Sequence, residues 1–155
     1  MGRLTSVPGS TMDLNATIVH MDDFSVVNSA DGPYDLSARG ILETDDGHFI
    51  SVTGLGMLAN TPHIQAILTN ETAVEPTQWG EIQTLTTWSF QASGPYAALT
   101  ESTFFANIRL FPSNNEDTAA YVEYRLSKVL PGPVCTSPLE DMEAQRVVGT
   151  ATDEL

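Results

Sequence analysis

The stretch that decides the fold is Asp35-Leu-Ser-Ala-Arg-Gly-Ile-Leu-Glu-Thr-Asp-Asp-Gly-His-Phe-Ile-Ser-Val52. It predicts two β-strands joined by a tight turn at Asp46-Gly47, because an Asp-Gly pair between alternating segments tolerates the positive φ of a two-residue hairpin turn. Pairing across this turn would place Glu43 opposite Ile50 and Arg39 opposite Gly54. The hairpin therefore favours a β-rich fold and fixes which side chains share a face.

Further strands are expected on both sides of the hairpin, since polar and apolar residues alternate over 13–21, 79–91, 103–111 and 119–129. Thr61-Pro62 suits an N-cap followed by proline at the first helical position, which predicts a short helix. A second helical turn is expected at 96–101. The sum predicts an all-β fold, an antiparallel β-barrel (lipocalin-like or similar) with one or two short helices.

The 155 residues suffice for one domain. Residues 1–12 are rich in Gly, Pro, Ser and Thr and are predicted to form a flexible tail. The single barrel domain is expected over 13–130. Residues 131–155 are assigned to a C-terminal extension, in which Ser137-Pro138 and the acidic residues after it could begin a short helix.

Composition narrows the class of partner. Twenty acidic residues face six basic ones, and the formal charge is −14. Such a field repels phosphate backbones and anionic membrane surfaces, so we expect no nucleic-acid partner and no membrane partner. The simpler explanation of the charge is solubility. No secretory segment and no bilayer-spanning run is visible, which predicts a cytoplasmic protein.

The residues of the hairpin also resemble a known family. Leu36-Ser-Ala-Arg-Gly-Ile-Leu-Glu-Thr-Asp-Asp-Gly47 is similar to the domain-of-unknown-function 3237 family. The resemblance continues at Ile50, Val52, Gly54, Phe90, Tyr96, Leu99, Phe104 and Val122-Glu-Tyr-Arg-Leu-Ser-Lys-Val129. It implies a β-barrel. Similar fungal proteins are small, intracellular and found among secondary-metabolism proteins, so the resemblance also implies a tailoring enzyme.

Arg39 and Glu43 form the first candidate catalytic pair. They are four residues apart on one strand and therefore point the same way. If that face lines the barrel, they make an electrophile and a base in a low-dielectric pocket. If it faces solvent, they are ordinary surface charges, and the more apolar character of the opposite face favours this alternative.

His20 and Tyr124 are the other candidate catalytic residues. His20 lies on the apolar face of its strand, before Asp22-Asp23, where a histidine beside a carboxylate can shuttle protons. The alternative is a satisfied core or edge histidine. Tyr124 shares the more apolar face of its strand and could donate a hydrogen bond into a pocket, whereas Glu123 is expected on the surface.

A mixed aromatic and hydroxyl face on 79–91 suits a small-molecule pocket. The candidate substrate-binding residues are Trp88, Thr84, Thr86 and Phe90. Ordinary core packing is the alternative. Metal-ligand spacing, a phosphate loop and a dinucleotide fingerprint are absent from the sequence, so no metal and no cofactor is expected.

These patterns favour a cofactor-independent tailoring enzyme of the isomerase, cyclase or dehydratase type. It would act on a small apolar secondary metabolite in a barrel pocket by acid/base chemistry and shape control. The alternatives are a non-catalytic binding or carrier barrel and an interaction protein with a solid barrel. The expected partner is the small apolar metabolite, and a homodimer is left open.

Overall fold

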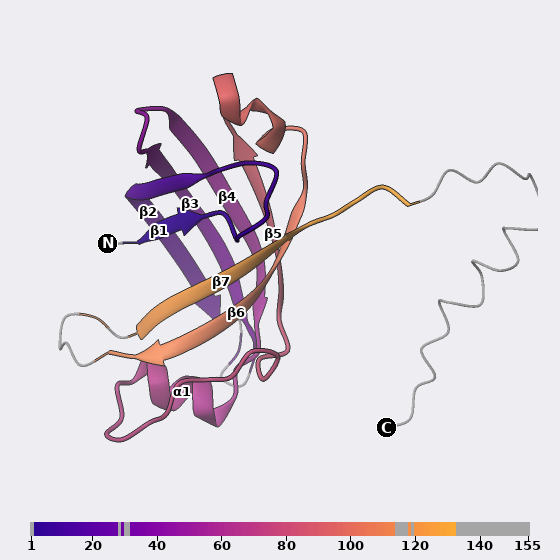
Figure 1. The fold of residues 1–155 in the computed structure, drawn as a ribbon. Coiled ribbons are helices and arrows are strands. Elements are labelled where there is room, and N and C mark those ends of the chain that lie inside the picture. The colour runs from indigo at the N-terminus through magenta and orange to yellow at the C-terminus, as the bar shows by residue number, and fades with distance from the viewer. Residues whose placement is uncertain (1, 28, 30–31, 114–117, 119, 133–155) are drawn as a thin grey trace, which may run out of the picture.

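The computed structural model describes residues 2–27, 29, 32–113, 118 and 120–132. Its seven strands form one antiparallel sheet in which they lie side by side in sequence order (Figure 1). The elements are β1 (Arg3–Thr5), β2 (Asn15–Val27), β3 (Tyr34–Thr44), β4 (Phe49–Leu58), α1 (Pro62–Leu68), β5 (Leu85–Gln91), the 3₁₀ helix η1 (Gly94–Leu99), β6 (Phe104–Pro112) and β7 (Ala120–Lys128).

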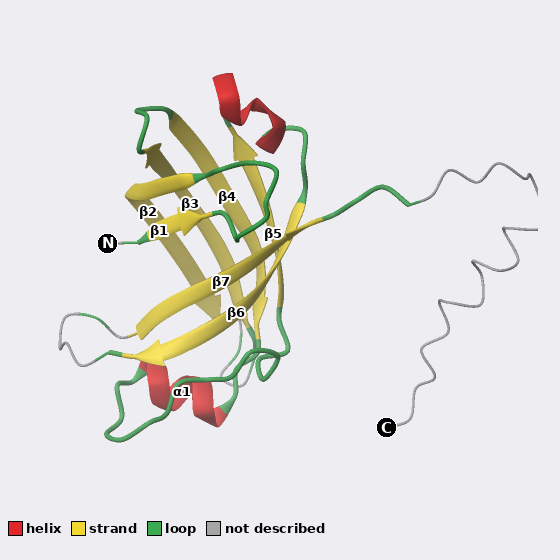
Figure 2. Cartoon of the chain, viewed as in Figure 1, coloured by secondary structure: helices red, strands yellow, loops and turns green. Residues whose placement is uncertain are grey.

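The sheet curls into an open half-barrel, with β6 and β7 in front of β2, β3 and β4 (Figure 2). Among the described strands, β7 pairs only with β6, and β1 covers β2 only at Asn15, Ala16 and Thr17. The barrel is therefore open between β2 and β7. The predicted all-β antiparallel barrel with short helices is confirmed.

The β3–β4 hairpin is present, but its register differs from the prediction by one residue. The Thr44 amide donates to the His48 carbonyl at 2.9 Å, and Gly47 has φ +84°, whereas Asp46 has no positive φ. The loop therefore runs from 45 to 48 and is longer than a two-residue turn. Glu43 consequently lies opposite Phe49.

This shift exchanges the two faces of β4, because side chains alternate along a strand. Ile50, Val52 and Gly54 point inward and are buried, while Phe49 points outward and is 60% exposed. Arg39 lies opposite Thr53, and Gly54 lies opposite Ala38 on the inner face. The predicted pairing of Arg39 with Gly54 is therefore wrong.

A β-bulge at Val19 changes the faces of β2. Ile18 lies opposite Leu42, but His20 lies opposite Ile41. The extra residue turns His20 outward, where its side chain is 66% exposed, and turns Met21 and Asp23 inward. The prediction that His20 lies on the apolar face is therefore wrong.

The N-terminal residues differ from the predicted tail. Arg3, Leu4 and Thr5 pair with β2, and the Arg3 guanidinium donates to Asn15 Oδ1 at 2.7 Å. The tail prediction is wrong for this strand. The predicted helix start at Ser137-Pro138 lies outside the described residues.

Helix α1 begins as predicted. Thr61 Oγ1 accepts a hydrogen bond from the Ile64 amide at 3.2 Å, and Pro62 is the first helical residue. Ile64 and Ile67 are buried and close one end of the half-barrel. No helix in the described ranges is both long and apolar enough to cross a membrane.

The connection from α1 to β5 is held against the sheet and is not part of a strand. The predicted strand over 79–91 begins only at Leu85, because Gly80 takes a left-handed conformation with φ +82°. The Leu110 amide donates to Thr77 Oγ1 at 2.9 Å, and the Arg125 guanidinium lies 4.1 Å from the Trp79 ring centre. Stacked arginine on tryptophan fixes this connection outside β6 and β7.

Candidate functional site

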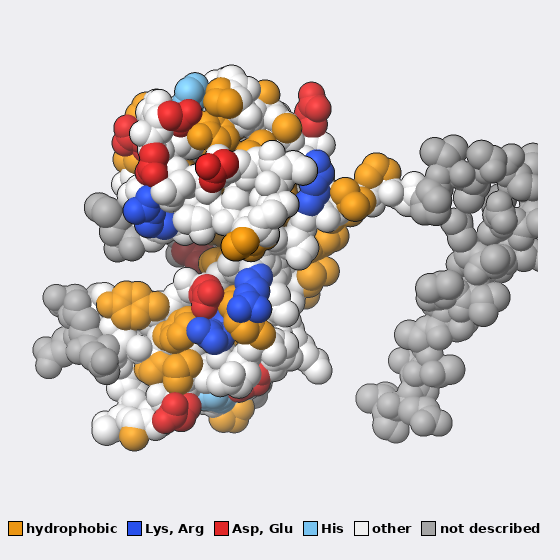
Figure 3. Space-filling model, viewed as in Figure 1, with side chains coloured by type: hydrophobic (Ala, Val, Ile, Leu, Met, Phe, Trp, Pro, Cys, Tyr) orange, Lys and Arg blue, Asp and Glu red, His pale blue; other side chains and the backbone are white. Residues whose placement is uncertain are grey.

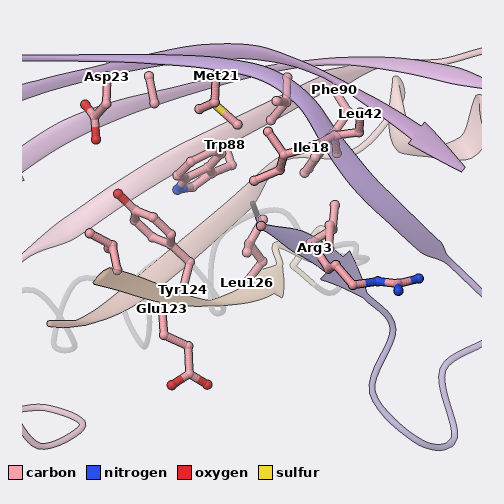
Figure 4. Close-up of a pocket in the computed structure, with 15 residues that line it drawn as sticks. Arg3, Ile18, Met21, Asp23, Leu42, Trp88, Phe90, Glu123, Tyr124 and Leu126 are labelled. Atoms are coloured by element: carbon pink, nitrogen blue, oxygen red, sulfur yellow. The ribbon is translucent and has the colours of Figure 1, made fainter. Parts of the chain in front are cut away.

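A mostly apolar cavity of about 350 Å³ lies inside the half-barrel, between β2 and β7 (Figure 4). Figure 3 shows the surface hollowed between the part that carries β1 and the part that carries β6 and β7. The lining residues are Gly2, Arg3, Leu4, Ile18, Met21, Asp23, Ala38, Leu42, Val52, Trp88, Phe90, Val122, Glu123, Tyr124 and Leu126.

Asp23 supplies a carboxyl group to this cavity. The bulge at Val19 turns it to the inner face, where it pairs with Ala38 in register. Its side chain reaches solvent at the mouth of the cavity, yet the apolar surroundings desolvate the carboxylate and raise the pKa of Asp23. Burial is the cause of this shift, and in the described part of the chain no cation or hydrogen-bond donor contacts the carboxylate.

Tyr124 supplies a hydroxyl group at the same end of the cavity (Figure 4). Its ring packs edge-on against Trp88, with ring centres 4.8 Å apart. Burial, and then the charge of Asp23, raise the pKa of Tyr124 far above its usual range. The phenol therefore stays protonated, and it acts on a ligand through hydrogen bonds, as a donor or an acceptor.

Trp88 forms the back wall of the cavity. Its indole Nε1 donates to Thr86 Oγ1 at 2.9 Å, and this hydroxyl donates to the Ala106 carbonyl at 3.3 Å. Gly54 on the neighbouring strand leaves the space that the indole fills. The Trp88 ring is thus fixed by two strands and presents one face to the cavity.

The predicted substrate-binding residues separate into two pairs. Trp88 and Phe90 line the cavity. Thr86 is buried behind Trp88 and its hydroxyl is already bonded, so it positions the indole and does not face a ligand. Thr84 precedes β5 and lies outside the cavity, with a buried hydroxyl that has no hydrogen-bond partner among the described residues.

The structure does not bring the predicted catalytic residues together. Arg39, Glu43 and His20 lie on the outer, solvent-facing side of the sheet, and His20 Nε2 pairs with Asp22 at 3.0 Å. The inner-face alternative for Arg39 and Glu43 is therefore wrong, and the surface alternative holds. Of the four residues, Tyr124 alone lines the cavity.

Asp23 is the ionisable residue that the sequence analysis missed. The signal was Gly40, an isolated glycine inside a strand, which often marks a bulge in the neighbouring strand. A Cβ atom at Gly40 would collide with the carbonyl oxygen of His20, so the bulged backbone of β2 needs this glycine. In the described ranges no group of three His, Cys, Asp or Glu side chains could hold a metal ion.

The turn acids have a structural role. Asp46 Oδ1 accepts hydrogen bonds from Thr44 Oγ1 at 2.5 Å and from the Tyr96 hydroxyl at 3.0 Å. The Thr44 bond is the main cause that lowers the pKa of Asp46. These contacts attach the hairpin loop to η1, outside the cavity.

Comparison with known proteins places the chain in a family. A family model described as "Protein of unknown function (DUF3237)" matches residues 1–129, which include every strand and the whole cavity. The chain belongs to the DUF3237 family. A search of curated proteins found no match.

Two solved structures resemble this DUF3237 chain in fold. A protein of unknown function from Clostridium acetobutylicum is 19% identical, with a TM-score of 0.53 over 74% of this chain and 70% of its own. A β-barrel-like protein from Acinetobacter baumannii is also 19% identical, with a TM-score of 0.50 over 74% of this chain and 68% of its own. At this identity the likeness shows a shared barrel fold.

Proposed function

We propose that this DUF3237 protein is a cofactor-independent enzyme that moves a proton next to a carbonyl group, and so isomerises a small, mostly apolar secondary metabolite in the cytoplasm. One observation supports the proposal above others. An uncompensated carboxylate, Asp23, and a protonated phenol, Tyr124, face the same apolar cavity. Titratable groups perturbed by burial inside a cleft are typical of acid/base sites.

Each group has a role that its environment supports. The Asp23 carboxylate removes a proton from the carbon next to the substrate carbonyl. The electron pair of that C–H bond forms a carbon–carbon double bond, and the π electrons of the carbonyl move onto its oxygen. The Tyr124 hydroxyl stabilises this oxyanion as a hydrogen-bond donor. Asp23 then returns the proton to the same carbon or to the far end of the conjugated system, which gives the isomer.

The surroundings strengthen both interactions. Trp88 and Phe90 are buried and cover the back of the cavity with apolar rings. A hydrogen bond to a developing oxyanion is stronger in such a low-dielectric site than in water. The raised pKa of Asp23 brings its basicity closer to that required of a general base near neutral pH.

The test is exchange of α-protons for deuterium in a simple apolar ketone, followed by NMR in D₂O. The wild-type protein should accelerate exchange above the buffer rate. Asp23→Asn should reduce the acceleration by about 100-fold or more, and Tyr124→Phe by about 10–100-fold. Asp22→Asn is the matched control, because Asp22 is the next residue on the same strand and points outward.

The carrier alternative gives a different outcome. In a Trp79→Phe background, Trp88 is the single tryptophan and its fluorescence reports binding. A fluorescence change without any accelerated exchange would refute the enzyme and favour the carrier. Exchange that is equal in wild type and Asp23→Asn would refute the role of Asp23.

A further inference from the structure

A second cavity of about 390 Å³ lies at the α1 end of the half-barrel. Its walls are mostly apolar and come from α1 and from β2, β3, β4, β6 and β7, with Leu36, Leu58, Leu68 and Ile108 among them. Each cavity alone has the size of an ordinary small-molecule site. The proposed reaction at Asp23 uses the first cavity and leaves this one unexplained.

The two cavities meet at the reactive pair. Asp23, Val122 and Tyr124 line both of them. Tyr124 also packs against both clusters of buried side chains, the one around Trp88 and the one under α1. The acid/base groups therefore stand between two apolar spaces, one on each side of them.

We infer that the substrate is an elongated, uncharged carbonyl compound with its carbonyl group near the middle and an apolar arm on each side. This inference rests on the proposed function. No basic side chain lines the second cavity in the described part of the chain. In the first, the Arg3 guanidinium is bonded to Asn15 and Asp45 and points away from the space (Figure 4). Neither cavity therefore offers a basic group to a carboxylate or phosphate of a ligand. An apolar end of a ligand needs no such partner.

The test compares two thirteen-carbon ketones that differ only in the place of the carbonyl, at the central carbon or next to one end, together with a seven-carbon methyl ketone. Binding is measured by Trp88 fluorescence in the Trp79→Phe background. The central ketone should bind at least tenfold more tightly than its isomer, because both arms are then buried.

A variant that fills the second cavity tests the contribution of that cavity alone to ligand binding. Ala120 lines that cavity, so Ala120→Phe should remove the preference for the central ketone and leave binding of the seven-carbon ketone unchanged. Ala98→Phe, on the exposed side of η1, is the control for the same substitution. Equal binding of the two isomers, or a preference that survives Ala120→Phe, would overturn the inference.

The outcome is distinguishable from failure of the proposed function. If the central ketone is preferred but no variant or wild-type protein exchanges its α-protons, the two-armed binding site stands and the proton-transfer chemistry is wrong. If exchange occurs but without a preference between isomers, the chemistry stands and the two-armed substrate is wrong.

Discussion

Gly54→Ala should show how tightly the back wall of the cavity is built. A Cβ atom at Gly54 would lie 2.8 Å from Cε2, Cζ2 and Cη2 of Trp88, whereas ordinary contact begins at 3.4 Å. The indole must therefore retreat by about 0.6 Å. Its retreat is opposed by the 2.9 Å hydrogen bond to Thr86 and by the ring of Tyr124.

Forced overpacking of this kind costs about 1–3 kcal/mol of unfolding free energy. We expect a lower midpoint in urea with an unchanged m-value, and a weaker Trp88 fluorescence response to ligand, since the indole moves into the cavity. Gly132→Ala is the control, because a Cβ atom there has no neighbour within 4 Å.

The decisive measurement is a double-mutant cycle. Trp88→Phe removes the part of the ring that the new methyl group meets, so Gly54→Ala should cost clearly less in that background. If the methyl group costs the same with and without the indole, the destabilisation comes from the strand backbone and the proposed packing of Gly54 against Trp88 is wrong.

Three further outcomes follow from the charges and hydrogen bonds. His63 has a raised pKa, from its bonds to the Glu75 carbonyl and to Glu81, and Glu81 has a lowered one, chiefly from the Gln78 amide. Their stabilisation is therefore full between the unfolded pKa values of 4.5 and 6.5 and is lost as the pH rises through the folded pKa of His63. The melting-temperature difference between wild type and His63→Gln should therefore shrink as the pH rises above 6.5. Asp23→Asn should remove activity and raise the melting temperature at pH 7. The melting temperature rises because a carboxyl group with a raised pKa destabilises the fold once it is ionised. Equal melting temperatures would contradict the burial of the Asp23 charge. Tyr96→Phe removes a 3.0 Å bond to Asp46 and should lower the midpoint of denaturant unfolding. The effect of Tyr96→Phe should be smaller in an Asp46→Ala background, where this bond is already absent.

The elements of the fold were predictable because their signals are local. Alternation predicts β2, β3, β4, β6 and β7 and the second half of the strand expected over 79–91, but it misses β1. The Thr61-Pro62 pair places the start of α1 to the residue. Register was not predictable from the same signals. It depends on whether one or two residues of the Asp45-Asp46-Gly47 turn adopt positive φ, and only Gly47 does. That single backbone choice decides which side of β4 faces the cavity.

The candidate site was predictable in part for the same reason. Trp88, Phe90 and Tyr124 lie on regular strands, so their alternation gives their faces correctly. His20 and Asp23 lie beyond a bulge, where alternation fails. The position of the bulge depends on Gly40 in the partner strand, and that is a contact between residues far apart in the sequence. The residue pattern of one strand alone does not predict such a contact with another strand.

The order of the strands has a consequence for how the chain folds. Every strand pairs with its neighbours in sequence, so each step of sheet formation closes only the loop between two consecutive strands. The step with the largest entropic cost joins β4 to β5, because residues 59–84 separate them. Helix α1 lies in this segment, and once the helix forms, fewer residues of the loop remain flexible. The central pair of the sheet is thus expected to form after the outer hairpins, with α1 as the element that sets its rate.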